Sequence, residues 1–319
     1  MPRFGYFLAS EEHGPKELVR QAVLAEQAGF ECLWISDHFH PWLDEQGNSP
    51  FVWSVIGALS QAVRLPVTTA VTCPTVRIHP AIVAQAAATS QILLDGRFVL
   101  GLGTGEALNE HITGARWPTA DERREMLEEA IEVIRELFTG RQVTRHGRHY
   151  TVDTARLYSL PSEPPPIYVS AFGDKAAAMA GRVADGLVTT MPDRQIVEAF
   201  RNAGGHGKPM QAGLKVCWAQ DESQAVKTVH RLWRNEQVGG EAAQILPLPR
   251  HFDQISELVT EEMIRQNVPC GPDVDRHVEA IRPFVEAGFD EIYINQIGPE
   301  PEGFFDFYSR EVLPRLRQG

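Results

Sequence analysis

Two segments near opposite ends of the chain carry the same junction between a helix and a strand. Residues 28–35 read Ala-Gly-Phe-Glu-Cys-Leu-Trp-Ile, and residues 287–294 read Ala-Gly-Phe-Asp-Glu-Ile-Tyr-Ile. In each, a glycine stands where a helix C-cap is expected, and a β-rich run follows it. A weaker version, at 181–190, leads through Gly186 into Leu-Val-Thr-Thr. Such junctions at both ends of a chain favour β/α units that supply one parallel sheet.

Apolar patterns elsewhere complete a set of eight strands that alternate with helices. The clearest helix runs from Thr119 to Phe138, with a capping box of Thr119 and Glu122 at its start. The strands are expected near 3–8, 31–36, 66–71, 97–101, 167–170, 186–190, 213–218 and 291–296.

Eight β/α units predict an α/β fold of the (β/α)8 TIM-barrel type, with an open doubly wound sheet as the alternative. We expect one domain over residues 1–319, because barrels of this length are common. Segments at about 141–160 and 236–262 do not fit the alternation. We expect them to be insertions at the C-terminal face of the barrel that shape the substrate mouth.

Composition narrows the classes of function. The net charge of −12 argues against nucleic-acid binding, which depends on basic surface. No stretch approaches the roughly 18 apolar residues that a membrane span needs. The scattered cysteines contain no C-x-x-C pair and predict reduced thiols in a cytoplasmic protein. They are Cys32, Cys73, Cys217 and Cys270.

The active site of a barrel lies at the C-terminal ends of its strands, and the second predicted strand ends in an unusual cluster. Residues 36–42 read Ser-Asp-His-Phe-His-Pro-Trp. One interpretation is a surface loop whose Asp and His cap a helix, and another is a metal site formed by His38 and His40. Pro41 suggests that the chain has already left the strand there, and no matching ligands follow other strands. We therefore expect no metal.

Two further strand ends carry candidate binding segments. After the fourth strand, Gly-Leu-Gly-Thr-Gly at 101–105 lets the backbone approach a planar ring or a phosphate, and Glu106 offers a carboxyl for proton exchange. After the fifth strand, Ser-Ala-Phe-Gly at 170–173 precedes an alanine-rich helix. That segment is either an anion cradle or an ordinary helix start capped by Asp174.

Together these segments resemble a known family. The runs Ser36-Asp-His-Phe-x-Pro-Trp42, Cys73-Pro-Thr-x-Arg77, Pro80-Ala-x-x-Ala-Gln85 and Gly103-Thr-Gly-Glu-Ala-Leu-Asn-Glu110 are similar to the F420-dependent branch of the luciferase-like superfamily. The resemblance extends from Phe4 to the C-terminal Leu313-Pro-Arg-Leu-Arg. It implies an oxidoreductase that uses coenzyme F420, an 8-hydroxy-5-deazaflavin, to transfer a hydride to or from a small-molecule alcohol, sugar or carbonyl. It also implies a homodimer.

The resemblance assigns roles to the residues that handle protons and substrate. His38 would lie beside the substrate oxygen as proton acceptor or electrostatic partner, which suits a neutral imidazole. Trp42 would stack near the reacting face, Glu106 would face the ring nitrogen that exchanges a proton, and Glu11 would line the pocket.

For the coenzyme itself, the resemblance implies that Asp37 contacts the deazaflavin ring. A non-prolyl cis peptide at Ala70–Val71 would bulge against that ring. Asn109, Ser170 and Gly173 would hold the phosphate and ribityl portion. The same site would include Cys73, Gly103, Thr104, Gly105, Ala171 and Phe172.

One departure from the family concerns the substrate. Where members that act on glucose 6-phosphate have a lysine after the sixth strand, this chain has Asp193, and their later basic pair falls on Ala243 and Gln266. An unphosphorylated substrate is one expectation. The alternative is a sugar-6-phosphate dehydrogenase whose phosphate site is rebuilt from Arg194, Arg250 or Arg265. Two more functions fit the same barrel, namely an FMN-dependent monooxygenase and a non-catalytic protein that binds a cofactor.

Overall fold

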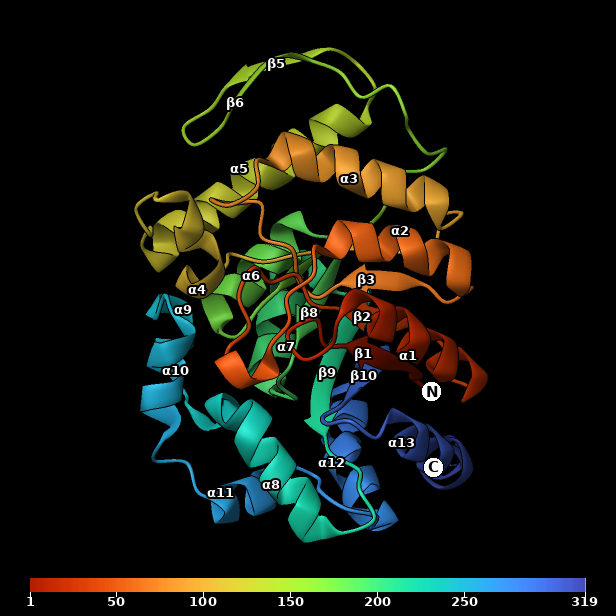
Figure 1. Ribbon diagram of the computed structural model, residues 1–319. Coiled ribbons are helices and arrows are strands. Elements are labelled where there is room, and N and C mark those ends of the chain that lie inside the picture. Colours follow the sequence, from red (N-terminus) through yellow and green to blue (C-terminus); the bar gives the residue numbers. More distant parts are fainter. Residues whose placement is uncertain (319) are drawn as a thin grey trace.

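The computed structural model describes residues 1–318, and its centre is a closed barrel of eight parallel strands (Figure 1). The barrel confirms the TIM fold and excludes the open sheet, because β1 pairs with both β2 and β10. In barrel order the strands are β1 (Arg3–Leu8), β10 (Glu291–Gln296), β9 (Met210–Val216), β8 (Gly186–Thr189), β7 (Ile167–Ser170), β4 (Phe98–Leu102), β3 (Val67–Thr69) and β2 (Leu33–Ile35).

Helices that follow the strands surround the barrel (Figure 1). They are α1 (Pro15–Gln27), α2 (Val52–Ala62), α3 (Pro80–Leu93), α5 (Ala120–Phe138), α6 (Asp174–Val183), α7 (Arg194–Phe200), α12 (Val274–Ala287), α13 (Pro301–Phe307) and α14 (Leu313–Leu316). No helix within residues 1–318 combines the length and the hydropathy that crossing a membrane requires.

The start of α5 differs in part from the predicted capping box. The Thr119 side chain accepts from the Glu122 N–H, as expected for an N-cap. The Glu122 carboxylate, however, accepts two bonds of 2.8 Å from Arg116. A full guanidinium charge is a stronger partner than a backbone N–H, so only half of the box forms.

Large side chains fill the inside of the barrel. Trp34 stacks on Tyr293 with ring centroids 4.3 Å apart, and the indole N–H donates to Gln211 at 2.9 Å. Gly213 lies against the same indole, where an added Cβ would come within 2.4 Å of a ring carbon. The barrel interior is therefore a packed core and not a pore, so a ligand has to bind outside it, at the strand ends.

Two segments leave the barrel. Strands β5 (Val143–His146) and β6 (Thr151–Ala155) form a small antiparallel sheet beyond α5 and α3 (Figure 1). This sheet joins the end of α5 to the start of β7, so the insertion expected at 141–160 starts from the N-terminal face of the barrel, and its expected place at the C-terminal face was wrong. Between β9 and α12, the backbones of Cys217 and Cys270 pair in an isolated parallel β-bridge. The chain therefore leaves the barrel and returns to it at the same place. We call residues 218–269 the excursion.

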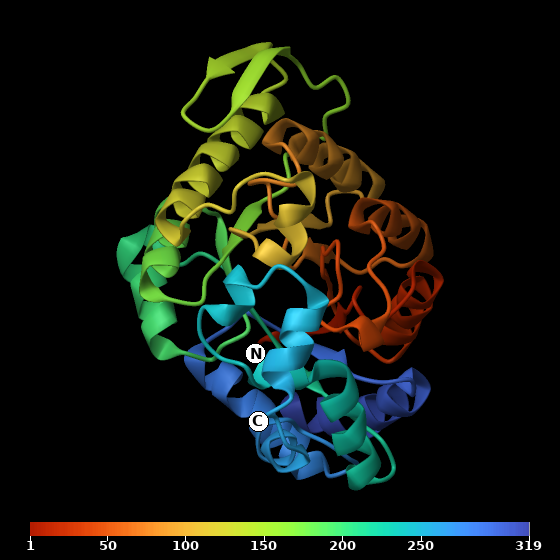
Figure 2. The same ribbon diagram turned by 60° about the vertical axis from the view of Figure 1, so that its left-hand side comes forward.

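The excursion contains four of the helices, and its middle part approaches the strand-end segments. Its α9 packs against the short α4 (Ala107–Glu110), and in Figure 2 these cyan and yellow segments lie side by side. The helices of the excursion are α8 (Glu222–Trp233), α9 (Ala242–Ile245), α10 (Pro249–Ser256) and α11 (Glu261–Asn267).

Candidate active site

The C-terminal ends of β1 and β2 are joined by a serine pair that positions a glutamate. The Ser10 N–H donates to Ser36 Oγ, and Ser10 Oγ donates to the Ser36 carbonyl, both at 2.8 Å. Ser36 Oγ in turn donates to Glu11 Oε2 at 2.6 Å. The Glu11 carboxylate is therefore buried and held at the end of the barrel. Ser36 had no predicted role, although it opens the cluster that contains His38.

The imidazole of His38 lies between a carboxylate and an aromatic ring. Its Nε2 is 3.4 Å from Glu11 Oε1, and its ring centroid is 5.1 Å from that of Trp42. Trp42 also packs edge-on against Phe252 of α10, at 5.1 Å. The structure thus brings together three of the predicted site residues and attaches them to the excursion.

Asn109 connects this group to the glycine-rich segment. Its Oδ1 accepts from the N–H groups of Phe39 and His40, at 2.9 and 3.1 Å. Its Nδ2 lies 3.1 Å from His38 Nδ1 and 3.4 Å from Glu106 Oε2. Asn109 is buried, and these contacts use both ends of its amide. They differ from the phosphate contact that the resemblance implies, which stays untested.

The two histidines considered as metal ligands have separate partners. His40 Nδ1 lies 2.9 Å from the Leu108 carbonyl, and its ring stacks on His111. His38 instead faces Glu11 and Asn109. Within residues 1–318 no cluster of three or more potential ligand side chains has the arrangement that a metal ion requires.

A buried ion-pair cluster lies beneath the predicted coenzyme site. Asp37 accepts from Thr72 Oγ1 at 2.7 Å and from Arg77 Nη2 at 2.9 Å. Arg77 also reaches Glu110, whose carboxylate accepts the N–H groups of Val76 and Arg77. Burial raises the pKa of Glu110 to about 7 despite these partners.

This cluster fixes the segments after β2, β3 and β4 relative to one another. Two of its charged members, Arg77 and Glu110, stood in the quoted motifs, but no local pattern predicted that they would pair. Both carboxylate oxygens of Asp37 are engaged, so a contact of that residue with the ring remains a prediction.

The segments after β3 and β4 pack closely. The Ala70–Val71 bond is cis, as predicted. A Cβ on Gly103 would lie 2.6 Å from Val71 Cγ2 and 3.0 Å from Ser170 Oγ, so a larger residue there would have to displace Val71. Cys73 is buried beneath this glycine, whereas Thr104 and Glu106 are partly exposed beside it. Gly105 has φ +85°, and Trp117 lies against it.

The start of α6 is open. Gly173 is the N-cap, and no side chain caps the helix, so Asp174 does not play the capping role considered from the sequence. An added Cβ at Gly173 would meet nothing within 4 Å. Ala171 is buried, while Phe172 is 53% exposed. Free N–H groups at a helix start suit a phosphate.

The residues considered from the sequence for a phosphate pocket mostly have other roles in the structure. Asp193 is the N-cap of α7, where it accepts from the Gln195 N–H at 2.7 Å. Gln266 donates to Glu262 within α11, and Ala243 is an apolar residue of α9. Arg265 pairs with Glu262 at 3.1 Å and with a second carboxylate at 3.7 Å. Within residues 1–318, neither Arg194 nor Arg250 has a carboxylate within 4.0 Å.

One cation at the strand ends was not anticipated. Lys215, near the end of β9, places its ammonium group 4.3 Å from the ring centroid of Trp233 and 5.5 Å from that of Phe7, and it pairs with Glu236. Its position on β9 was the available signal, because inward side chains at strand ends line barrel sites.

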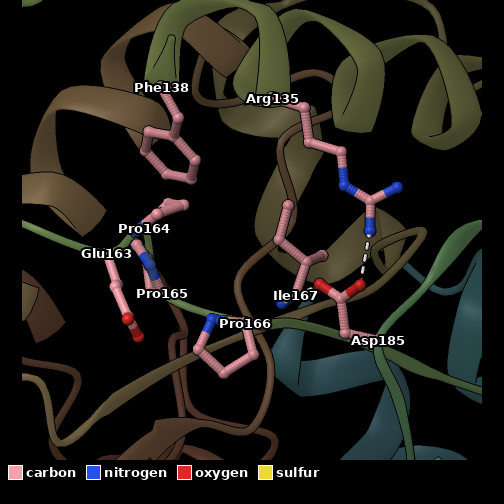
Figure 3. A pocket seen from close by; sticks show the side chains of 8 residues that line it. All are labelled: Arg135, Phe138, Glu163, Pro164, Pro165, Pro166, Ile167 and Asp185. Carbon is pink, nitrogen blue, oxygen red and sulfur yellow. Dashed lines mark hydrogen bonds and ion pairs between the residues drawn. The ribbon is translucent and has the colours of Figure 1, made fainter.

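A cavity of about 500 Å³ lies at the end of the barrel where the strands begin, opposite the predicted site (Figure 3). Three prolines, 164–166, and Ile167 line it where β7 begins, and Arg135 pairs with Asp185 at its edge. It contains none of the predicted site residues. The chemistry therefore has to be sought at the C-terminal strand ends.

Comparison with known proteins gives one consistent result. The profile of the luciferase-like monooxygenase family matches residues 1–291. An F420-dependent glucose-6-phosphate dehydrogenase of Microbacterium testaceum (strain StLB037) is 36% identical, with 99% of this chain and 98% of the relative covered. A relative of the same name from Nakamurella multipartita is 35% identical, with 99% and 96% covered.

Solved structures agree with these relatives. An F420-dependent secondary alcohol dehydrogenase, in complex with an F420-acetone adduct, superposes with a TM-score of 0.91 at 31% identity, and 99% of each chain is covered. A coenzyme F420 dependent tetrahydromethanopterin reductase from Methanopyrus kandleri has a TM-score of 0.78 at 21% identity, with 98% and 99% covered. The second likeness supports the fold alone.

Proposed function

Because the chain belongs to the luciferase-like monooxygenase family, we propose a reaction for it that rests on the geometry at its strand ends. The protein is an F420-dependent oxidoreductase that acts on CH–OH groups. In our proposal a hydride passes between an alcohol or sugar, or the matching carbonyl, and C5 of the deazaflavin. The observation that carries this proposal is the placement of His38 between Glu11 and Asn109, with Glu106 in contact with the same Asn109 NH2 group.

The residues present fit the coenzyme in two respects. The partly exposed Ala70 and Val71 offer an apolar surface beside the glycine segment, which suits a planar ring. The uncapped start of α6 at Gly173, with Ser170 nearby, suits a phosphate. When bound, the deazaflavin accepts or supplies the hydride, and the protein orients the reactants and handles protons.

The protons are assigned to two residues. His38 holds the substrate oxygen and takes or returns its proton, because an imidazole can serve as acid or base near neutral pH. Glu106 is partly exposed at the end of β4 and exchanges the proton of the coenzyme ring. Glu11 holds the imidazole through its carboxylate, and Trp42 covers the reacting face.

Coenzyme choice tests the proposal directly. Titration with oxidised F420 should quench tryptophan fluorescence saturably, because Trp42 is expected beside the ring. FMN should bind at least about tenfold more weakly, a difference of about 1.4 kcal/mol. Equal or tighter binding of FMN would favour the flavin-dependent monooxygenase instead.

We further propose that the protein is a homodimer joined through α2 and α3. These neighbouring surface helices contain no charged residue in their 11 and 14 positions, although 23% of the chain is charged. Phe51 and Ile82 are each 57% exposed on this face. Such an uncharged face is typical of an interface that is covered in solution.

Light scattering should give a mass about twice 35.5 kDa. Ile82→Arg should lower it toward the monomer, whereas Leu258→Arg, on an exposed residue of the excursion, should not. A wild-type monomer would rule out this interface.

We also assign the protein to the cytoplasm. Its four cysteines are free, and all are buried. Free thiols are typical of proteins in reducing compartments. Fractionation of the native host, with immunodetection of the protein, tests this assignment.

A further inference from the structure

The His38 ring has three polar neighbours, and they favour different positions for its proton. Nδ1 lies 3.2 Å from the His40 carbonyl, which can only accept, and 3.1 Å from Asn109 Nδ2, which can only donate. A neutral imidazole has one N–H and one lone pair, so Nδ1 can satisfy only one of these neighbours at a time. The tautomer of His38 is therefore a choice between Asn109 and the His40 carbonyl.

The orientation of the Asn109 amide is fixed by other groups. Its Oδ1 accepts from two backbone N–H groups, those of Phe39 and His40. Turning the amide over would place NH2 against both donors and leave these two partly buried N–H groups without acceptors. Asn109 must therefore present its NH2 group to His38.

Glu11 acts in the same direction from the other side of the ring. Its Oε1 lies 3.4 Å from His38 Nε2. A carboxylate favours an N–H over a lone pair at that nitrogen. Asn109 and Glu11 thus both favour the proton on Nε2, and the His40 carbonyl alone favours it on Nδ1.

We propose that Asn109 is a positioning residue that sets the tautomer of His38 and holds the proton on Nε2 in the resting protein. The resting ring then offers a hydrogen-bond donor on its Glu11 side. To accept a proton from an alcohol on the Glu11 side, Nε2 needs a lone pair. The ring must therefore first carry its own proton on Nδ1, which then donates to the His40 carbonyl and no longer accepts from Asn109. Only this last step rests on the proposed function, since the tautomer itself is a property of the free protein.

Nuclear magnetic resonance of the full chain labelled with 15N-histidine tests the assignment without coenzyme or turnover. Long-range 15N–1H correlation distinguishes the two tautomers, and His38→Gln identifies the His38 signals. At about pH 8, above the range in which free histidine titrates, wild-type His38 should carry its proton on Nε2. A proton on Nδ1 in the wild type would overturn the proposal.

Two substitutions of Asn109 should move the proton. Asn109→Asp keeps an acceptor for the two backbone N–H groups but offers Nδ1 a carboxylate, so the proton should shift to Nδ1. Asn109→Ser is too short to reach the ring and removes the donor that faces Nδ1. The fraction of His38 with its proton on Nδ1 should therefore rise, but less than in Asn109→Asp, because Glu11 still favours the proton on Nε2. If the ring keeps its proton on Nε2 in both folded variants, Asn109 does not set the tautomer.

Ser49→Ala is the matched control. Ser49 Oγ donates to the His38 carbonyl at 2.7 Å and does not touch the ring. Its loss should loosen the same loop without changing the tautomer. A tautomer change in Ser49→Ala equal to that in Asn109→Ser would mean that loop position, and not the amide, controls the ring. If the tautomers are as expected but the wild-type protein shows no F420-dependent activity, the result would count against the proposed function alone.

Discussion

The first four strands with the segments after them, residues 3–110, and the excursion, residues 218–269, meet at the same end of the barrel but are built differently. In the first region, buried charges face one another and share hydrogen bonds, as in the cluster of Asp37, Arg77 and Glu110. In the excursion, cations pair with exposed acids, as Arg234 does with Asp253 and Arg265 with Glu262. The shared hydrogen bonds of the first region hold its side chains in one geometry, as catalysis requires. The exposed ion pairs of the excursion constrain its side chains less, so this region can change with the substrate.

The largest effect should follow from removing the proposed acid–base group. His38→Ala should lower kcat for the true substrate by roughly 10²–10⁴-fold, the usual range for general acid–base catalysis, with coenzyme affinity little changed. His206→Ala removes an exposed histidine beyond α7 and should leave turnover near normal. Steady-state kinetics, together with fluorescence titration of the coenzyme, measures both. Near-normal turnover in His38→Ala would mean that the first region does not contain the proton-handling site.

The buried Glu110 should make stability depend on pH. Its pKa is about 7 in the folded protein, against an ordinary value of 4.5. Between these values the folded state keeps a proton that the unfolded state has released. The free energy of unfolding should therefore fall as pH rises, by about 3 kcal/mol in total from this group.

Glu110→Gln removes the titrating proton and should lack this dependence. The measurement is chemical denaturation at several pH values between about 4.5 and 7. Glu261→Gln, which removes an exposed carboxylate in the excursion, should keep the wild-type slope. Identical slopes in all three proteins would show that Glu110 is ionised throughout.

The contrast between the regions also marks what the sequence could predict. The eight strands were predictable because glycine junctions and apolar runs are local signals, although β9 begins at Met210 and not near 213. The rule that barrel sites lie at strand ends pointed to the segment with His38 and Trp42, whereas Glu11 was expected in the pocket only because of the family resemblance. The pairing of Arg77 with Glu110, and the place of Lys215 between two rings, depend on contacts between distant segments. No local pattern encodes them.

The excursion should decide whether phosphorylated substrates are accepted. The family resemblance implies cations at Ala243 in the excursion and at Asp193 before α7, and losing a charge-assisted hydrogen bond costs about 1.5–3 kcal/mol. Glucose 6-phosphate should therefore have a kcat/KM at least about tenfold below that of the best neutral alcohol or sugar. Kinetics on matched free and phosphorylated sugars measures the ratio. A strong preference for the phosphorylated form would mean that the site has been rebuilt with other cations.

The smallest effect is expected from Arg265, an arginine of the excursion whose charge is already paired with carboxylates. It pairs with Glu262 at 3.1 Å and with Glu222 at 3.7 Å, and both of these carboxylates are exposed. Exposed pairs of this kind contribute about 0–1 kcal/mol, and a phosphate would have to displace both carboxylates before it gained the guanidinium. Arg265→Ala should therefore change the ratio of phosphorylated to free sugar by no more than about twofold. Arg250→Ala is the comparison within the same region, because Arg250 is exposed and has no carboxylate within 4.0 Å in residues 1–318. Arg265→Ala could instead abolish a preference for phosphorylated sugars while Arg250→Ala does not. A paired surface arginine would then determine specificity, which would contradict the distinction between a rigid first region and an adaptable excursion.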